Sequence, residues 1–274
     1  MTNIAHVHGM AAPSWAGGAL IAATHTGVAR WTEDGGWRTV GEARHDLMGF
    51  RVDPATDGTL YGSGHPDLRT GLPNPLGLVV SHDGGRSWTV RSLGGEADLH
   101  ALATIGAEGS SLLGWDALAN TLLRSTDGGA TWEADAAPAL AATGGVLALD
   151  AHPSEPQRVW AATADGLWVS DDRGAVWRPT GFQGSPTTVV HGADRATAWA
   201  YAIDRPGGLV RSADGGETWA WIAAPIAPGA HATAMTVDAL DPDVVYVATS
   251  TVDVFRSTDG GGTWTALVVG GEVR

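Results

Sequence analysis

A short motif, Ser-x-Asp-Gly-Gly-x-x-Trp, recurs along the chain and limits its possible folds more than any other feature. Its copies are SHDGGRSW at Ser81, STDGGATW at Ser125, SADGGETW at Ser212, STDGGGTW at Ser257, the degenerate SDDRGAVW at Ser170 and the shortened TEDGGW at Thr32. Successive copies are 42 to 49 residues apart, close to the length of one four-stranded propeller blade. The repeat therefore predicts an all-β, six-bladed β-propeller.

Each residue type in the motif has a mechanical role in a tight hairpin. The Asp side chain accepts hydrogen bonds from the backbone of its own turn, and Gly-Gly permits positive φ angles. The Trp then packs between neighbouring sheets. The motif resembles the Asp-box (BNR) repeat of sialidases, sortilin-type receptors and photosystem assembly factors. That resemblance implies Asp-box turns between the third and fourth strands of each blade, and it implies little about activity because these boxes brace the scaffold.

The spacing predicts one propeller domain over residues 1–274. The blades are expected at approximately 4–41, 45–93, 97–136, 143–182, 186–224 and 230–270. The chain opens with a first strand and closes with a fourth strand, TWTALVV. We therefore expect the ring to close by packing whole blades, without a strand exchanged between the termini.

Composition excludes several classes of function. The chain has no cysteine, so disulfides, thiolate metal sites and cysteine nucleophiles are ruled out. Its net charge of -14 argues against nucleic acid or an anionic membrane as a partner. A small-molecule substrate is expected. No apolar run of about 18 residues occurs. The start, MTNIAHVHGM, lacks the features of a secretory signal, so a cytoplasmic location is expected.

Residues that can bind a ligand gather at one end of the blades. First strands begin HVHGM (6–10), DLMGF (46–50), DLHAL (98–102) and HATAM (231–235), and three second strands end at His25, His65 and Asp116. These strand ends meet around the axis, on the face opposite the Asp boxes. Seven of the 10 histidines map there, namely His6, His8, His25, His45, His65, His100 and His231, whereas His82, His152 and His191 fall elsewhere.

This clustering predicts a transition-metal centre. Residues i and i+2 of a strand share a face, so His6 and His8 point the same way, and imidazoles and carboxylates are suitable ligands. A subset of His6, His8, His65 and His100 is expected to hold the metal. Asp46 or Asp98 would be a ligand or would orient a histidine. His25 and His231 would lie at the edge, His25 as a catalytic group and His231 as a further ligand.

The identity of the metal is open. Met48 aligns with His8 and His100 and is a possible soft ligand that would favour copper, although a methionine also fills gaps in a core. Iron, manganese and zinc are alternatives. Equally, the polar groups could simply be hydrogen-bonded side chains that line a wet central channel.

Further features bear on the candidate site. The segment PDLRTGLPNPLG (66–77) is either a stiff rim over the centre or a plain surface insertion. Glu96 is a candidate acid or base, or a solvated loop acid. Asp46, Asp98, Asp116 and Glu96 could supply the carboxylate pair of a glycosidase. Trp115 is the tryptophan that could serve as a sugar platform.

The segments HVHGM, ATHTG, HDLMGF, GSGHP, NPLG and GEADLH look like those of bacterial Asp-box proteins labelled glycosylhydrolases. A sialidase is excluded, because no arginine falls at the aligned axial positions and the Arg-Ile-Pro signature is absent.

Three functions are consistent with these observations. The first is a metal-dependent enzyme acting on a small molecule, with redox chemistry favoured over hydrolysis. The second is a metal-free lyase, cyclase or glycoside hydrolase that uses His–Asp pairs as acid and base. The third is a non-enzymatic propeller that binds or assembles partner proteins.

Overall fold

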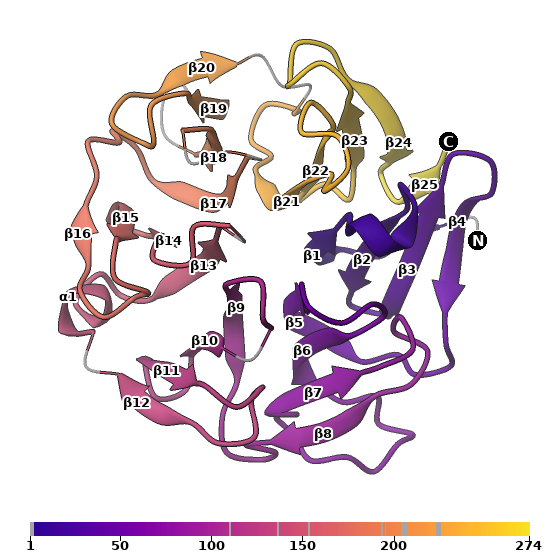
Figure 1. Ribbon diagram of the computed structural model, residues 1–274. Helices are drawn as coiled ribbons and strands as arrows, with labels where there is room; N and C mark the ends of the chain where they lie inside the picture. The colour runs from indigo at the N-terminus through magenta and orange to yellow at the C-terminus, as the bar shows by residue number, and fades with distance from the viewer. Residues whose placement is uncertain are drawn as a thin grey trace.

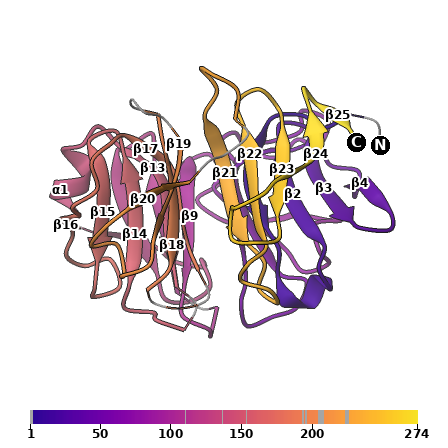
Figure 2. The ribbon, with the colours of Figure 1, turned by 90° about the horizontal axis from the view of Figure 1, so that it is seen from above.

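The computed structural model describes residues 3–109, 111–135, 137–152, 154–192, 194, 196–203, 208–222 and 226–274. Its strands form six antiparallel sheets arranged around a central axis (Figure 1). Seen from the side, the strands stand roughly parallel to that axis, and the molecule is a disc (Figure 2). The predicted six-bladed β-propeller is confirmed. None of the described helices is long and apolar enough to span a membrane.

Each blade is built from strands that are consecutive in the chain. The elements are β1 (Val7–Ala11), η1 (Ser14–Ala16), β2 (Leu20–Thr24), β3 (Gly27–Thr32) and β4 (Gly36–Val40); β5 (Asp46–Val52), β6 (Leu60–His65), β7 (Leu78–Ser81) and β8 (Thr89–Ser92); β9 (Leu99–Ile105), β10 (Ser111–Asp116), β11 (Thr121–Ser125) and β12 (Glu133–Asp135); α1 (Pro138–Ala141), β13 (Val146–Ala151), β14 (Val159–Thr163), β15 (Gly166–Ser170) and β16 (Arg178–Pro179); β17 (Pro186–His191), β18 (Ala198–Ala202), β19 (Gly208–Ser212) and β20 (Ala220–Ile222); and β21 (Ala232–Val237), β22 (Val245–Thr249), β23 (Val254–Ser257), β24 (Thr265–Val269) and β25 (Glu272–Val273).

The hydrophobic core is divided among the gaps between blades. Each of six clusters of buried side chains joins two adjacent sheets, including a cluster that joins the last blade to the first. Second strands such as β2, β14, β18 and β22 are buried at every residue. Both faces of these strands pack against a neighbouring blade, which explains why their sequences are continuous apolar runs without alternation. The first strands of adjacent blades contact one another around the axis.

The Asp box of the third blade shows how the motif braces its hairpin. Asp127 Oδ1 accepts the backbone N–H of Thr131 at 2.9 Å, and Asp127 Oδ2 accepts the Thr131 hydroxyl at 2.6 Å. Ser125 Oγ accepts the N–H of Gly129 at 2.9 Å and donates to Asp127 Oδ1 at 2.8 Å. Trp132 packs against the core between the second and third blades. These contacts all serve the scaffold.

The box turns share a face of the disc with the loops between first and second strands. Gly84 N–H donates to Gly58 O at 2.8 Å, and Gly260 N–H donates to Asp243 O at 2.9 Å. First strands therefore begin on the opposite face. We call this the histidine face, and the face with the boxes the box-side face.

The ring closes with all four strands of each blade taken from one stretch of chain, as expected. The structure adds a contact between the termini that the sequence analysis did not foresee. The last blade has a fifth strand, β25, and Asn3 forms a bridge with Glu272. The two ends of the chain accordingly lie side by side (Figure 1). The last blade is also tied to the first by a salt bridge between Arg256 and Glu33, at 2.5 Å.

Candidate functional site

An irregularity in the first strand of every blade sets one residue outside the regular strand pairing, and in most blades this residue lines the axial hollow. The pairing of first and second strands slips by one residue near the histidine face, which is the signature of a β-bulge. The residues inside these slips are His8, Met48, His100, Leu147, Thr187 and Thr233. Blades 1 to 3 thus carry His, Met and His at a position where the other blades carry Leu or Thr.

Three of the predicted site residues meet at one point. His8 Nε2 lies 3.3 Å from His25 Nδ1 and 3.3 Å from Asp46 Oδ1, and His25 Nδ1 lies 2.8 Å from Asp46 Oδ2. Asp46 Oδ1 is buried and has no hydrogen-bond partner. Among the described residues, these three form a group whose donor atoms all lie within 4.8 Å of one another. His25, expected at the edge, is therefore central.

The surroundings of His8 and His6 favour the neutral form of these two imidazoles. Burial lowers the pKa of His8, Asp46 opposes this, and His25, His6 and His100 reinforce it, so that the pKa of His8 falls to about 4. The pKa of His6 is also lowered, first by burial and then by His25 and His231. The His6 ring lies 4.8 Å from the His8 ring and 5.3 Å from the His25 ring, between centroids. At neutral pH the His8 ring is therefore uncharged, and its Nε2 either carries one proton or has a free lone pair.

A second group forms beside the first. His100 Nε2 lies 2.9 Å from Asp98 Oδ2, and His65 Nε2 lies 3.9 Å from the same oxygen. The hydrogen bond to Asp98 raises the pKa of His100 against the effect of its burial. Asp98 Oδ1 is buried without a partner. Hence the residues predicted as one ligand set divide into two neighbouring groups.

Asp116 accepts hydrogen bonds from backbone N–H groups near the end of its strand. Its Oδ1 accepts the N–H groups of Asp98 at 3.1 Å and Leu118 at 3.0 Å, and the residue is buried. Asp116 thereby holds the strand end on which Asp98 sits, which is a positioning role. The prediction that it takes part in catalysis remains untested.

The other predicted residues lie outside both groups. The backbone of His231 forms hydrogen bonds with Ser250, and His231 lowers the pKa of His6. Met48 and His8 both line a narrow hollow on the axis. Glu96 lies exposed in the turn after β8. His45 is buried, and its Nδ1 accepts the N–H of Asp67 at 2.9 Å.

The idea of Trp115 as a sugar platform is wrong. The ring is 2% exposed and belongs to the core between the third and fourth blades, so no sugar can stack on it.

The segment 66–77 is an ordered rim beside the second group. Asp67 Oδ2 accepts the N–H of Arg44 at 2.9 Å, Leu76 is wholly buried, and Asn74 Oδ1 lies 2.9 Å from His65 Nδ1. This last contact fixes the ring of His65 with its Nε2 toward Asp98. Of the two interpretations of the segment, its packing and its contact with His65 favour the rim.

Two hollows follow the axis. A narrow waist of about 40 Å³ is lined by His8, Met48 and His100, and also by Arg51 and Met235. The last two residues line a larger cavity of about 440 Å³ as well, which is formed by the ends of the first strands on the box-side face. This cavity contains a polar cluster that the sequence analysis missed, because only the starts of the first strands were compared there.

No protein-family model matches the chain. A xyloglucanase from a Paenibacillus species is 30% identical over 169 residues, which cover 59% of this chain and 14% of that protein. The fold superposes on the xyloglucanase from Xanthomonas campestris with a TM-score of 0.67 and 23% identity, over 98% of this chain and 46% of that one. Virginiamycin B lyase from Staphylococcus aureus gives a TM-score of 0.62 at 14% identity, over 97% and 86% of the two chains.

The fold and the repeats define the chain as an Asp-box β-propeller. Within that class it is related in sequence to a xyloglucanase, and it spans less than half the length of the two xyloglucanases above. The two structural likenesses, both under 25% identity, establish the fold.

Proposed function

We propose that the chain is a hydrolase whose active centre is the cluster of His8, His25 and Asp46, working with a bound divalent metal ion. The observation that carries the proposal is the convergence of two imidazole nitrogens and a carboxylate at 2.8 to 3.3 Å from one another. Two histidines and one carboxylate on one side of an ion leave its other positions open for water and substrate.

The geometry of the cluster fits such an ion. Tetrahedral coordination with bonds of about 2.0–2.2 Å places neighbouring ligand atoms roughly 3.3–3.6 Å apart, and two of the three separations here are 3.3 Å. Asp46 Oδ1 is buried with no hydrogen-bond partner, as an unused ligand atom would be. The depressed pKa of His8 keeps its ring neutral, as metal binding requires.

The remaining residues supply acid–base chemistry and orientation. A metal ion held here would polarise a substrate oxygen and lower the pKa of a bound water. His100, charged more readily because Asp98 raises its pKa, is placed to donate a proton to a leaving group. His65, held by Asn74 and near Asp98, would orient the substrate at the rim.

Hydrolysis is proposed in place of the redox chemistry expected from the sequence. The relative in sequence is named for a hydrolytic activity, although this chain covers only 14% of it. The cluster that converges is a nitrogen and oxygen set, which suits zinc, manganese or iron without requiring a soft ligand. Nothing in the contacts of Met48 favours copper.

A metal-free hydrolase is the second candidate. The specific observation is the pair formed by His100 and Asp98 at 2.9 Å beside a second carboxylate, Asp46, which contributes to the raised pKa of His100. A protonated imidazole next to a carboxylate base is a competent acid–base pair.

The test is hydrolysis of p-nitrophenyl esters, phosphates and β-glycosides by untagged protein. It is first stripped with a chelator and then reloaded with Zn²⁺, Mn²⁺ or Fe²⁺. We expect activity only after reloading, and we expect Asp46→Asn to lower kcat/KM by at least about 100-fold, as the loss of a metal ligand does.

His82→Gln is the matched control, because it removes a histidine that contacts Thr59 on the box-side face, away from the proposed centre. This variant should keep full activity. Activity that survives chelation but is lost in Asp98→Asn would select the metal-free candidate. Equal activity of Asp46→Asn and the natural chain under all conditions would contradict the proposed centre.

A further inference from the structure

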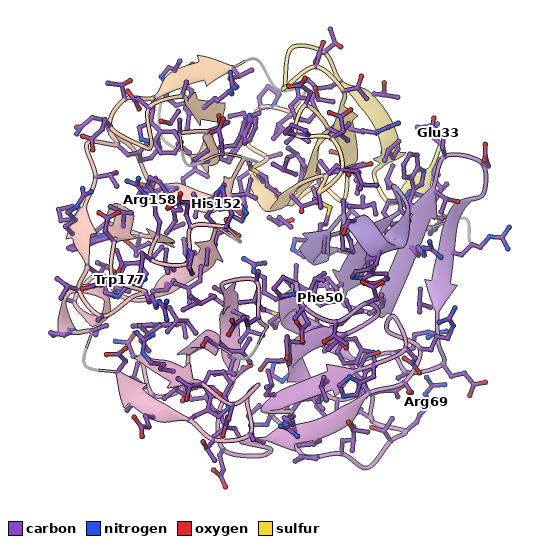
Figure 3. All side chains as sticks on the ribbon, viewed as in Figure 1. Glu33, Phe50, Arg69, His152, Arg158 and Trp177 are labelled. Carbon is purple, nitrogen blue, oxygen red and sulfur yellow. The ribbon has the colours of Figure 1, made fainter. Side chains whose placement is uncertain are left out.

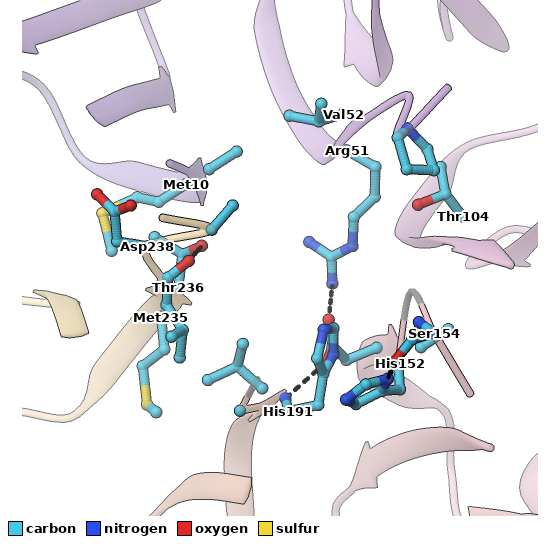
Figure 4. A pocket seen from close by; sticks show the side chains of 18 of the residues that line it. Met10, Arg51, Val52, Thr104, His152, Ser154, His191, Met235, Thr236 and Asp238 are labelled. Carbon is cyan, nitrogen blue, oxygen red and sulfur yellow. Dashed lines mark hydrogen bonds and ion pairs between the residues drawn. The ribbon is translucent and has the colours of Figure 1, made fainter. Parts of the chain in front are cut away.

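The box-side cavity holds a charged cluster independent of the proposed active centre. Asp150 is buried and accepts the backbone N–H of His191 at 2.8 Å, and its carboxylate also contacts the ring Nδ1 of His191. Arg51 Nη2 lies 3.7 Å from the other carboxylate oxygen. Figure 4 shows the Arg51 guanidinium reaching into the cavity toward this pair. One oxygen of Asp150, Oδ2, is therefore held by His191, and the other, Oδ1, is paired in charge with Arg51.

His152 carries an unused donor on the same wall. The residue is 3% exposed, and its Nε2 is buried with no hydrogen-bond partner. Its Nδ1 accepts the N–H of Ser154 at 3.1 Å, which leaves the proton of the neutral ring on Nε2. Burial lowers the pKa of His152, so the neutral ring is the relevant form. Figure 3 shows this residue close to the axis.

The turn itself does not require a histidine. Asp53 and Asp238 stand at the corresponding places in the second and last blades, where Oδ1 accepts the N–H of Ala55 and of Leu240, each at 2.8 Å. An aspartate therefore closes the same turn with its side-chain oxygen. What His152 adds is the second nitrogen, which an aspartate lacks. The proximity of the Ser154 hydroxyl to His152 Nδ1, at 3.0 Å, is a by-product of this turn.

The balance of donors and acceptors indicates what the cavity would bind. The N–H groups of His152 Nε2 and Arg51 Nε are buried without partners, whereas Asp150 Oδ2 is occupied by His191 and Asp150 Oδ1 faces the Arg51 cation. A ligand must therefore bring acceptor atoms. Much of the remaining wall is apolar and includes Met10, Val190 and Met235. The volume of about 440 Å³ lies in the range of small-molecule sites.

We propose that the box-side cavity binds a small aliphatic monocarboxylate. Its carboxylate would accept hydrogen bonds on the side of His152 and Arg51, away from Asp238, which lies across the cavity (Figure 4). Its hydrocarbon chain would contact Met10 and Met235. The waist shares Arg51 and Met235 with this cavity and His8 with the active centre, so the ligand would sit at the far end of the same axial channel.

Binding is tested by calorimetric titration of the full chain with butanoate, hexanoate and octanoate, and with 1-octanol as the uncharged counterpart. We expect saturable one-to-one binding that strengthens with chain length and is at least about tenfold weaker for the alcohol, as expected for a charge-assisted hydrogen bond. His152→Asp keeps an acceptor for the turn and removes the donor. It should weaken octanoate binding by at least about tenfold.

Two control variants separate this site from its alternatives. Ser154→Ala and His8→Gln should leave octanoate affinity within about twofold, because neither removes a donor that faces the ligand. Equal binding of octanoate and 1-octanol, undiminished binding in His152→Asp with an unchanged unfolding temperature, or no saturable binding of any carboxylate would each overturn the proposal. Loss of binding in His8→Gln would transfer the ligand to the active centre and overturn it too.

Discussion

Removing one carboxylate oxygen from the proposed metal centre should abolish its stabilisation by metal ions. A ligand that binds only the folded state adds RT ln(1 + [L]/Kd), which is about 2.7 kcal/mol at a free metal concentration of 100 Kd. With an unfolding entropy of roughly 2.1 cal/mol/K per residue, a chain of 274 residues should gain about 5 °C in melting temperature. Asp46→Asn keeps the shape of the side chain and removes the anionic ligand, so its gain should fall below about 1 °C.

The assay is thermal unfolding of chelator-stripped, untagged protein, followed by circular dichroism with and without Zn²⁺ or Mn²⁺. The metal-free melting temperatures of Asp46→Asn and the natural chain should be similar, because Asp46 is partly exposed and an amide oxygen can still accept the hydrogen bond from His25 Nδ1. His82→Gln should retain the full gain. If Asp46→Asn gains as much stability from the metal as the natural chain does, the ion binds elsewhere and the proposed metal centre is refuted.

Three further outcomes follow from the structure. In metal-free protein the pKa of His8 is about 4, against about 6.5 in the unfolded chain. The unfolded state therefore binds more protons below pH 6.5, and the free energy of unfolding should fall by about 2–3 kcal/mol between pH 6.5 and 4. Urea titrations of His8→Gln should show a smaller fall. Asp98→Asn should lower the pKa of His100, measured by NMR titration; an unchanged value would mean that the pair is not formed. Gly128 and Gly129 both have positive φ, but a Cβ on Gly129 would lie 2.0 Å from a leucine methyl, whereas a Cβ on Gly128 would lie 3.8 Å from its nearest neighbour. Denaturant unfolding should therefore show that Gly129→Ala lowers the free energy of unfolding by about 3 kcal/mol and Gly128→Ala by about 1 kcal/mol. Equal losses would contradict the packing.

The architecture could be predicted because the Asp box is a local structure that repeats. Its Asp, Gly and Trp act within one hairpin and the adjoining core, so spacing alone predicts the number of blades. The alignment of first strands also placed His8, Met48 and His100 at one level, and the β-bulges show why: each bulge turns the same position toward the axis. The spacing of the motif does not predict which side chains from different blades come into contact.

The details of the site depend on contacts between blades. His25 was expected at the edge, yet the end of its strand brings its Nδ1 to Asp46 of the next blade. The sequence did not indicate that Trp115 is buried. Both faces of a propeller strand can be covered by neighbouring blades, so the position of a residue in the strand does not show whether it is exposed. The cluster of Asp150, His152 and His191 lies at the ends of first strands. Comparing His152 with Asp53 and Asp238 at that turn is the signal that would have revealed it.

The most direct test of the proposed centre is an anomalous diffraction experiment on crystals of untagged protein soaked in Zn²⁺ or Mn²⁺, with data collected on both sides of the metal absorption edge. One strong peak is expected on the histidine face, at about 2.0–2.2 Å from His8 Nε2, His25 Nδ1 and a carboxylate oxygen of Asp46. A map without a peak there, or with ions only on exposed carboxylates of the box-side face, would contradict the proposed centre.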